Sequence, residues 1–313
     1  MWNTAGVSEH SEPGAGATGQ EGRPKVLYVM GAGRSGSTIL GVALGNCERV
    51  FFAGELDRWL ARAGMPRDGA ERERFWAQVR EQVDYAPELA GGRTTWLERS
   101  SSLFDLRKWR ARRRLRESYR RVSQELYRAI ARVADATHVV DTSHYPMRAR
   151  ELQSLVDIEL YLLFLVRDPQ SVVASLGRSD VPERRFGALA ANVYLWLTYL
   201  LAVAVFARHP AERRLFVRHE DFLASPEAVL GRILRQCGAG DTLPDLTCLR
   251  TGVPFHGNRL IKSETVALGP RQQTQQRRSP LTAVLQGPWE IVFSQLRPAV
   301  AAAAPDQPAP APA

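Results

Sequence analysis

The sequence is poor in lysine. Only three of its 42 basic residues are lysines, Lys25, Lys108 and Lys262, and the other 39 are arginines. With 33 acidic residues, the chain carries a formal net charge of +9 at pH 7. A bias in genome composition is enough to explain the preference for arginine. The surplus of positive charge favours anionic partners such as phosphorylated cofactors, acidic lipids or nucleic acid.

Cysteine is also scarce. The three cysteines, Cys47, Cys237 and Cys248, are an odd number and form no C-x-x-C pair. This argues against a disulfide framework and against a zinc site, and it fits a reducing compartment. Residues 1–24 lack the charged and then apolar pattern of a signal peptide. We therefore expect a cytoplasmic protein.

No apolar run has the length of a membrane-spanning helix. The longest, at 193–207, has 15 residues, whereas a bilayer requires roughly 20. It predicts a buried helix, with a membrane-associated segment as the alternative.

The two ends of the chain differ in composition from its middle. Residues 1–24 are rich in glycine, serine, glutamate and threonine, and residues 299–313 in alanine and proline. Both segments are predicted to be disordered. Residues 25–298 are predicted to form one folded domain.

A helical region is predicted over 56–135, with loops near 67–69 and 91–92. Its last helix shows one apolar stripe at three- and four-residue spacing, made by Leu115, Tyr119, Val122, Leu126, Ile130 and Val133. A last short helix is expected to start at Pro288 or Trp289.

Short apolar runs predict the strands of a sheet, at 26–30, 50–52, 138–141, 160–166 and 215–217. Helix-like segments separate them, and this alternation is typical of an α/β fold with a mainly parallel sheet in three α/β/α layers. Ligands of such folds bind beyond the carboxyl ends of the strands.

A glycine-rich loop follows the first predicted strand in VMGAGRSGSTILG, residues 29–41. A strand, a glycine loop and a helix start together form a cradle of backbone N–H groups for phosphate. The usual triphosphate loop has lysine where Ser37 stands, and here Arg34 supplies the cation. This departure disfavours triphosphate chemistry.

Three further segments carry polar side chains to the same edge of the sheet. In FLVRDPQSVVASLGR, Arg167 ends a strand and Ser175 follows eight residues later in the next helix, so the two are candidates for holding a second phosphate. Taken alone, a strand-end arginine paired with a surface carboxylate is the simpler explanation. In FHGNRLIKS, Arg259 is another candidate for anion binding. The third set contains acid–base candidates that follow predicted strands: Glu55, Asp141, Ser143 and His144.

These motifs resemble those of sulfotransferases that use 3′-phosphoadenosine-5′-phosphosulfate (PAPS). The likeness covers about residues 25–265 and implies a sulfotransferase fold related to that of P-loop nucleotide-binding proteins. The family's 5′-phosphosulfate loop is matched, in the form typical of the carbohydrate and tyrosylprotein branches, by Arg34, Ser35, Gly36, Ser37 and Thr38.

Other family positions are matched in order along the chain. Arg167 and Ser175 resemble the family's 3′-phosphate site. The segment with Arg259 resembles the family's late loop, which closes over this phosphate. His219 stands where the family usually has tyrosine. VVDTSHYPMRA resembles the bacterial pattern D-S-S-K-x-P-x-R-A, with His144 at the lysine position.

The resemblance implies transfer of a sulfuryl group from PAPS to a hydroxyl or amine, with no metal required. It implies that Arg34 stabilises the leaving group and that Glu55 is the base, as in the tyrosylprotein branch. A structural ion pair is the alternative role for Glu55. His144 is the second choice of base, or a donor to the leaving group. The expected acceptor is a carbohydrate, a glycolipid or a small metabolite, held by residues 56–135 and residues after 260.

Two other functions stay open at this point, a P-loop kinase using magnesium and ATP, and a nucleic-acid-binding protein. The second would use the basic run at 107–114. We expect that run to be a solvated helix face and no nucleic acid to bind, with an acidic glycan or a membrane surface as alternative partners of the run.

Most tryptophans of the helical region are expected in the core: Trp59, Trp76, Trp96 and Trp109.

Overall fold

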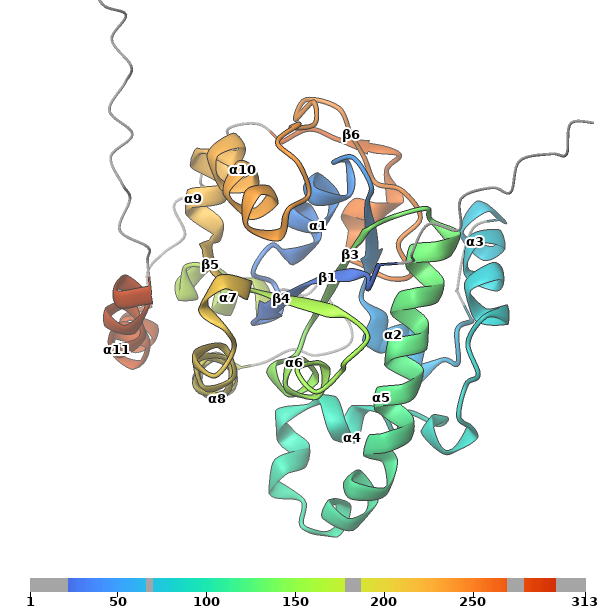
Figure 1. Cartoon of the computed structure of the whole chain (residues 1–313). Helices are drawn as coiled ribbons and strands as arrows, with labels where there is room; N and C mark the ends of the chain where they lie inside the picture. The colour runs from blue at the N-terminus through green and yellow to red at the C-terminus, as the bar shows by residue number, and fades with distance from the viewer. Residues whose placement is uncertain (1–21, 66–69, 178–186, 269–278, 297–313) are drawn as a thin grey trace, which may run out of the picture.

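A computed structural model describes residues 22–65, 70–177, 187–268 and 279–296 of the chain (Figure 1). Its centre is a parallel sheet in the order β2-β3-β1-β4-β5. The strands are β1 (Lys25–Gly31), β2 (Val50–Gly54), β3 (His138–His144), β4 (Glu159–Val166) and β5 (Arg214–Arg218). All five predicted strands are therefore confirmed.

Helices cover both faces of this sheet, so the predicted three-layer α/β/α architecture is confirmed. Along β1, Leu27 and Val29 face one hydrophobic layer, whereas Val26, Tyr28 and Met30 face the other. This alternation follows from the two-residue period of a strand.

The smaller layer consists of α1 (Ser37–Gly45), α9 (His219–Ala224) and α10 (Pro226–Cys237). The larger layer contains α2 (Leu56–Ala61), α3 (Ala70–Glu81), α5 (Arg107–Val133), α6 (Pro146–Leu152), α7 (Pro169–Leu176), α8 (Ala188–Ala207) and α11 (Pro280–Leu296).

Short elements complete the chain. They are η1 (Pro87–Leu89), α4 (Thr95–Glu98), η2 (Ser100–Phe104), η3 (Ala211–Arg213), η4 (Arg259–Lys262) and the two-stranded pair β6 (Leu249–Arg250) and β7 (Thr265–Val266).

The helical region between β2 and β3 matches the prediction. The stripe on α5 is buried from Leu115 to Ile130, and Val133 is partly buried. The predicted loop at 91–92 is a turn, and the one at 67–69 lies outside the described residues.

The long apolar helix α8 is only partly buried. Its length and mean hydropathy of 1.9 would suit a membrane span, yet 44% of its apolar 18-residue stretch is buried inside the fold. Leu195, Tyr199 and Ala202 are fully buried. The prediction of a buried helix is therefore confirmed for one face of α8. On the other face, Val193 and Leu200 are more than half exposed.

Two predictions of local structure were wrong. The last helix begins at Pro280 and continues through Pro288, because Trp289 and Phe293 pack against Tyr199 and hold it in place. The strand β3 extends to His144, beyond the polar turn expected after 141.

The extension of β3 follows its pairing with β1, where His144 lies opposite Met30. A buried ion pair lies beside this end of the strand. The Arg148 guanidinium, on α6, donates to Asp141 Oδ2 from Nη2 at 3.0 Å and from Nε at 3.2 Å. It also contacts Tyr119 and Tyr127 of α5, and it lies 3.5 Å from Glu98 Oε1. Asp141 and Arg148 are fully buried.

Asp141 and Ser143 therefore have structural roles, and their prediction as acid–base residues was wrong. Asp141 Oδ1 accepts hydrogen bonds from the backbone N–H and the hydroxyl of Ser143. The Ser143 hydroxyl in turn accepts from the N–H of Asp57 at 3.0 Å, which fixes the start of α2 against β3.

We predict that Arg148→Ala lowers the free energy of unfolding by about 3–5 kcal/mol, because it leaves two carboxylates buried without their cation. Urea unfolding of the variant measures this loss. Arg121→Ala is the matched control, since its partner Asp84 is 83% exposed and such surface pairs contribute about 1 kcal/mol or less. Equal losses in the two variants would contradict the structural role of Arg148.

Candidate active site

The loop between β1 and α1 lies at the carboxyl edge of the sheet. Gly36 ends the loop with φ of 90°, a left-handed conformation that favours glycine. A Cβ at this position would lie 2.3 Å from Nδ1 of His219. Both constraints make glycine necessary here, and they place His219 directly against the loop.

Two features of the loop favour anion binding. No side chain caps the start of α1, so its first N–H groups, which lack partners within the helix, stay available to a ligand. Ser35 is 1% exposed, and its hydroxyl has no hydrogen-bond partner among the described residues. A buried hydroxyl without a partner is costly, and an oxyanion bound in the loop would satisfy it.

Arg34 links the two predicted anion sites. Its side-chain Nε donates to the Ser175 hydroxyl at 3.2 Å, and its backbone carbonyl accepts from Arg167 Nη1 at 3.2 Å. Arg167 follows β4, and Ser175 lies on α7. The structure thus brings the three residues together, with Arg34 between the glycine loop and the second site.

The start of α7 is held in a fixed position beside Arg167. Asp168 accepts from the N–H and the hydroxyl of Ser171 at 3.0 and 2.8 Å. The N–H of Asp168 donates to Glu220, on α9, at 2.8 Å. These contacts restrain the backbone from which Arg167 extends.

Glu55 follows β2 and faces the same edge. Its Oε2 lies 3.0 Å from His256 Nδ1 and 3.6 Å from Arg58 Nε. Burial raises the pKa of the Glu55 carboxyl, but the hydrogen bond with His256 and the neighbouring His144 and Arg58 outweigh it, so the pKa lies below its usual value. Glu55 is therefore an ionised carboxylate at neutral pH.

The late loop that carries Arg259 is docked on the end of β2. The N–H of Glu55 donates to the His256 carbonyl at 2.9 Å, and the N–H of Phe255 donates to the Ala53 carbonyl at 2.9 Å. A Cβ on Gly54 would lie 2.2 Å from the same His256 carbonyl. Only glycine allows this close approach of the two backbones.

The docked loop also reaches α1. A Cβ on Gly257 would lie 3.6 Å from the methyl group of Thr38. Arg259, at the start of η4, is exposed. The predicted segment that carries Arg259 therefore lies beside the glycine loop.

His144 stands at the end of β3 with φ of 59°. A Cβ on Gly33 would lie 3.7 Å from His144 Nε2, so the ring borders the glycine loop. Burial lowers the pKa of His144, and the charge of Glu55 opposes this shift only in part. The ring is therefore neutral at pH 7 and able to accept a proton.

The sequence reasoning missed two residues of this edge. His256 was quoted in a motif but given no role, although it lies three residues before Arg259 and bonds to Glu55. Tyr194 accepts from the N–H of Gly33 at 3.0 Å. No sequence signal marked Tyr194, because it lies within an apolar run.

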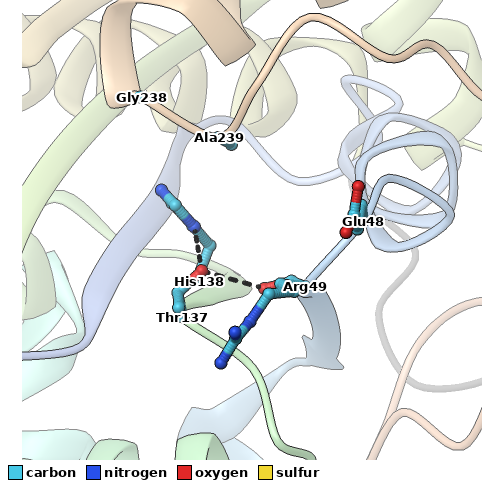
Figure 2. Close-up of a pocket in the computed structure, with 6 residues that line it drawn as sticks. All are labelled: Glu48, Arg49, Thr137, His138, Gly238 and Ala239. Carbon is cyan, nitrogen blue, oxygen red and sulfur yellow. Dashed lines mark hydrogen bonds between the residues drawn. The ribbon is translucent and has the colours of Figure 1, made fainter. Parts of the chain in front are cut away.

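A small pocket lies at the opposite edge of the sheet (Figure 2). It measures about 170 Å³ and is lined by Glu48, Arg49, Thr137, His138, Gly238 and Ala239. His138 pairs with Lys25 at the first positions of β3 and β1, so this pocket is separate from the glycine loop. The ring of His138 contacts the Cys237 carbonyl at 3.1 Å, which indicates a structural role.

The arrangement agrees with a known family. A family model described as the sulfotransferase family matches residues 25–242. The chain belongs to the sulfotransferase family. The match ends before the late loop, and the likeness of the glycine loop to particular branches of the family stays a prediction. No curated protein matches the sequence.

One solved structure supports the fold, and a second is reported as a similarity only. A sulfotransferase domain from the curacin biosynthetic pathway is 20% identical, with a TM-score of 0.51, over 85% of this chain and 98% of that one. A sulfotransferase domain from the Synechococcus PCC 7002 olefin synthase is 16% identical, with a TM-score of 0.48, over 86% and 96% of the two chains.

One acidic residue near the loop is not available to a magnesium ion, which the kinase alternative would require. This is Asp141, on the strand next to β1. Both of its carboxylate oxygens are occupied by internal hydrogen bonds, and its side chain is fully buried.

We predict that Glu55→Gln lowers the pKa of His144 further, because the carboxylate charge that favours the imidazolium is removed. At a given pH near 6, the variant should hold less protonated His144 than the wild type. Histidine NMR titration measures this, with the His144 signal assigned from its loss in His144→Asn. His138, at the opposite edge, is the control and should not move. An unchanged His144 would contradict its electrostatic contact with Glu55.

Proposed function

We propose that this sulfotransferase transfers a sulfuryl group from PAPS to a hydroxyl or amine of a carbohydrate, a glycolipid or a small metabolite. The observation that carries the proposal is the contact of Arg34 with both Arg167 and Ser175. Two anion sites that adjoin at one arginine suit a donor with a 5′-phosphosulfate and a separate 3′-phosphate.

The donor would lie across the carboxyl edge of the sheet. We assign the 5′-phosphosulfate to the backbone and hydroxyl groups of residues 34–38, where the buried Ser35 hydroxyl lacks a protein partner among the described residues. We assign the 3′-phosphate to Arg167, Ser175 and Arg259. Arginine suits both positions, because its planar guanidinium matches phosphate and sulfate oxygens.

The proposed reaction is an in-line displacement. The acceptor oxygen or nitrogen bonds to sulfur while the bond from sulfur to the bridging oxygen breaks, leaving adenosine 3′,5′-bisphosphate. Negative charge develops on that oxygen, where Arg34 and the loop N–H groups would stabilise it. Donors of this kind contribute about 3–4 kcal/mol each in other enzymes. The sulfuryl group carries less charge than a phosphoryl group, so no metal is needed to neutralise it.

The acceptor proton would pass to Glu55. The contacts of His256 and Arg58 with this carboxylate both fall on Oε2, and we assign Oε1 to the acceptor. Its lowered pKa keeps Glu55 ionised at neutral pH. His144, which is neutral and borders the loop, is the alternative base or a donor to the leaving group.

We also propose that the enzyme works in the cytoplasm. Cys47, Cys237 and Cys248 are all free thiols. Burial raises the pKa of Cys47 and Cys237 to about 11, so these two are unreactive thiols packed in the core. Three unpaired cysteines suit a reducing compartment.

The first experiment is calorimetric titration of adenosine 3′,5′-bisphosphate without magnesium, beside ADP and ATP. The bisphosphate should bind much more tightly than ADP, which lacks the 3′-phosphate. Arg167→Ala should weaken it about 10–100-fold, as expected for loss of a charged hydrogen bond. Arg235→Ala, at an exposed position of α10, is the matched control and should bind normally.

Two outcomes would overturn this proposal. If ATP bound better than the bisphosphate and required magnesium, the kinase function would replace it. If Arg167→Ala bound the bisphosphate as well as Arg235→Ala did, the 3′-phosphate assignment would be wrong.

We predict that Glu55→Gln keeps the affinity for the bisphosphate and lowers turnover by about 10²–10⁴, the usual effect of losing a general base. Turnover is measured with PAPS and any acceptor found by screening hydroxyl and amine compounds. His144→Asn is the companion variant. Normal turnover in Glu55→Gln together with a large loss in His144→Asn would assign the base to His144.

A further inference from the structure

The junction of η2 and α5 carries exposed apolar side chains. Phe104, Leu106 and Trp109 are 73%, 72% and 59% exposed. Trp59 and Trp76, by contrast, are fully buried in the core, as the sequence predicted for most tryptophans of this region. Single exposed apolar residues are common on protein surfaces, but three within six positions form a patch that needs an explanation. We call residues 104–114 the basic tip.

The tip is strongly basic. From 104 to 114 it contains six basic residues and one acidic residue, Asp105, which pairs with Lys108 at 2.9 Å. Most of the other basic residues are exposed arginines that form no ion pair with another described residue. They are Arg107, Arg110, Arg113 and Arg114.

Helix geometry places both kinds of side chain on one surface. Residues of a helix advance about 100° each, so the buried positions Leu115 and Tyr119 define the inner face of α5. Leu106, Arg110 and Arg113 fall on the opposite face, with Arg114 on one side of them and Trp109 on the other. The apolar and basic groups therefore point outward together.

This combination favours one partner over the others. A solvated helix face explains the arginines but not the exposed apolar side chains. An acidic glycan or a nucleic acid would use the arginines and the indole ring, yet neither gains from Leu106. An anionic bilayer uses every part, because arginines attract lipid phosphates while apolar side chains enter the interface and tryptophan prefers that depth.

We propose that the basic tip docks the protein onto an anionic phospholipid membrane. Charge complementarity and the exposed apolar cluster carry this inference. It is independent of the sulfuryl donor and of the base, so it can fail without affecting the proposed reaction. It favours a membrane surface, one of the alternative partners of the basic run, over a purely solvated helix face.

Vesicle sedimentation with the full chain tests the inference. The protein should bind vesicles of phosphatidylcholine with phosphatidylglycerol and bind poorly to phosphatidylcholine alone. Glutamine at Arg107, Arg110, Arg113 and Arg114 should weaken binding at least about 100-fold, since each arginine at an anionic surface is worth about fivefold.

The apolar contribution is tested separately. Phe104→Ser, Leu106→Ser and Trp109→Ser, combined, should weaken binding at least about tenfold with the charge unchanged. Val156→Ser and Ile291→Ser, combined, remove exposed apolar side chains elsewhere (69% and 65% exposed) and should bind like the wild type. Thermal melting checks that every variant is folded.

A charge-matched control separates docking by the tip from general attraction. Glutamine at Arg23, Arg208, Arg235 and Arg250 removes the same charge from other exposed positions. This quartet should bind vesicles within about threefold of the wild type. Three outcomes would overturn the proposal: no binding to anionic vesicles, equal losses in the two arginine quartets, or tip-dependent binding to heparin or DNA without binding to vesicles.

Discussion

The buried pair of Arg148 and Asp141 is the contact on which the arrangement of the site depends. It joins β3 to α6, and through Tyr119 and Tyr127 it joins both to α5. The same strand holds α2 through the Ser143 hydroxyl. The helical region 56–135 and the sheet are thereby fixed to each other at the place where Glu55 and His144 project. A buried charge pair adds little net stability, but removing one partner is costly, so this contact specifies one arrangement.

Much of the fold and part of the site could be predicted from sequence, because those features are local. A short apolar run between turns predicts a buried parallel strand at any place in the chain. The spacing of the glycines predicts the loop from Arg34 to Thr38. The spacing of Arg167 and Ser175 was also readable, since both follow one strand within eight residues. Family membership agrees with these local signals.

The features of the site that could not be predicted from the sequence depend on contacts between distant segments. His256 meets Glu55 across 201 positions and Tyr194 meets Gly33 across 161, and no spacing rule connects them. Asp141 looked like an acid–base residue because it follows an apolar run, and only its contact with Arg148 shows that it is structural. Pro288 suggested a helix start, but aromatic packing around Trp289 outweighed that local preference.

The docking of the late loop on β2 has a consequence for the order of events in a catalytic cycle. This loop carries Arg259, and through His256 it also holds the carboxylate of Glu55. Under the roles proposed for Arg259 and Glu55, a movement of this loop as one unit would alter the nucleotide contact and the contact of His256 with Glu55 together. Nucleotide exchange and proton abstraction would then belong to separate stages of the proposed cycle.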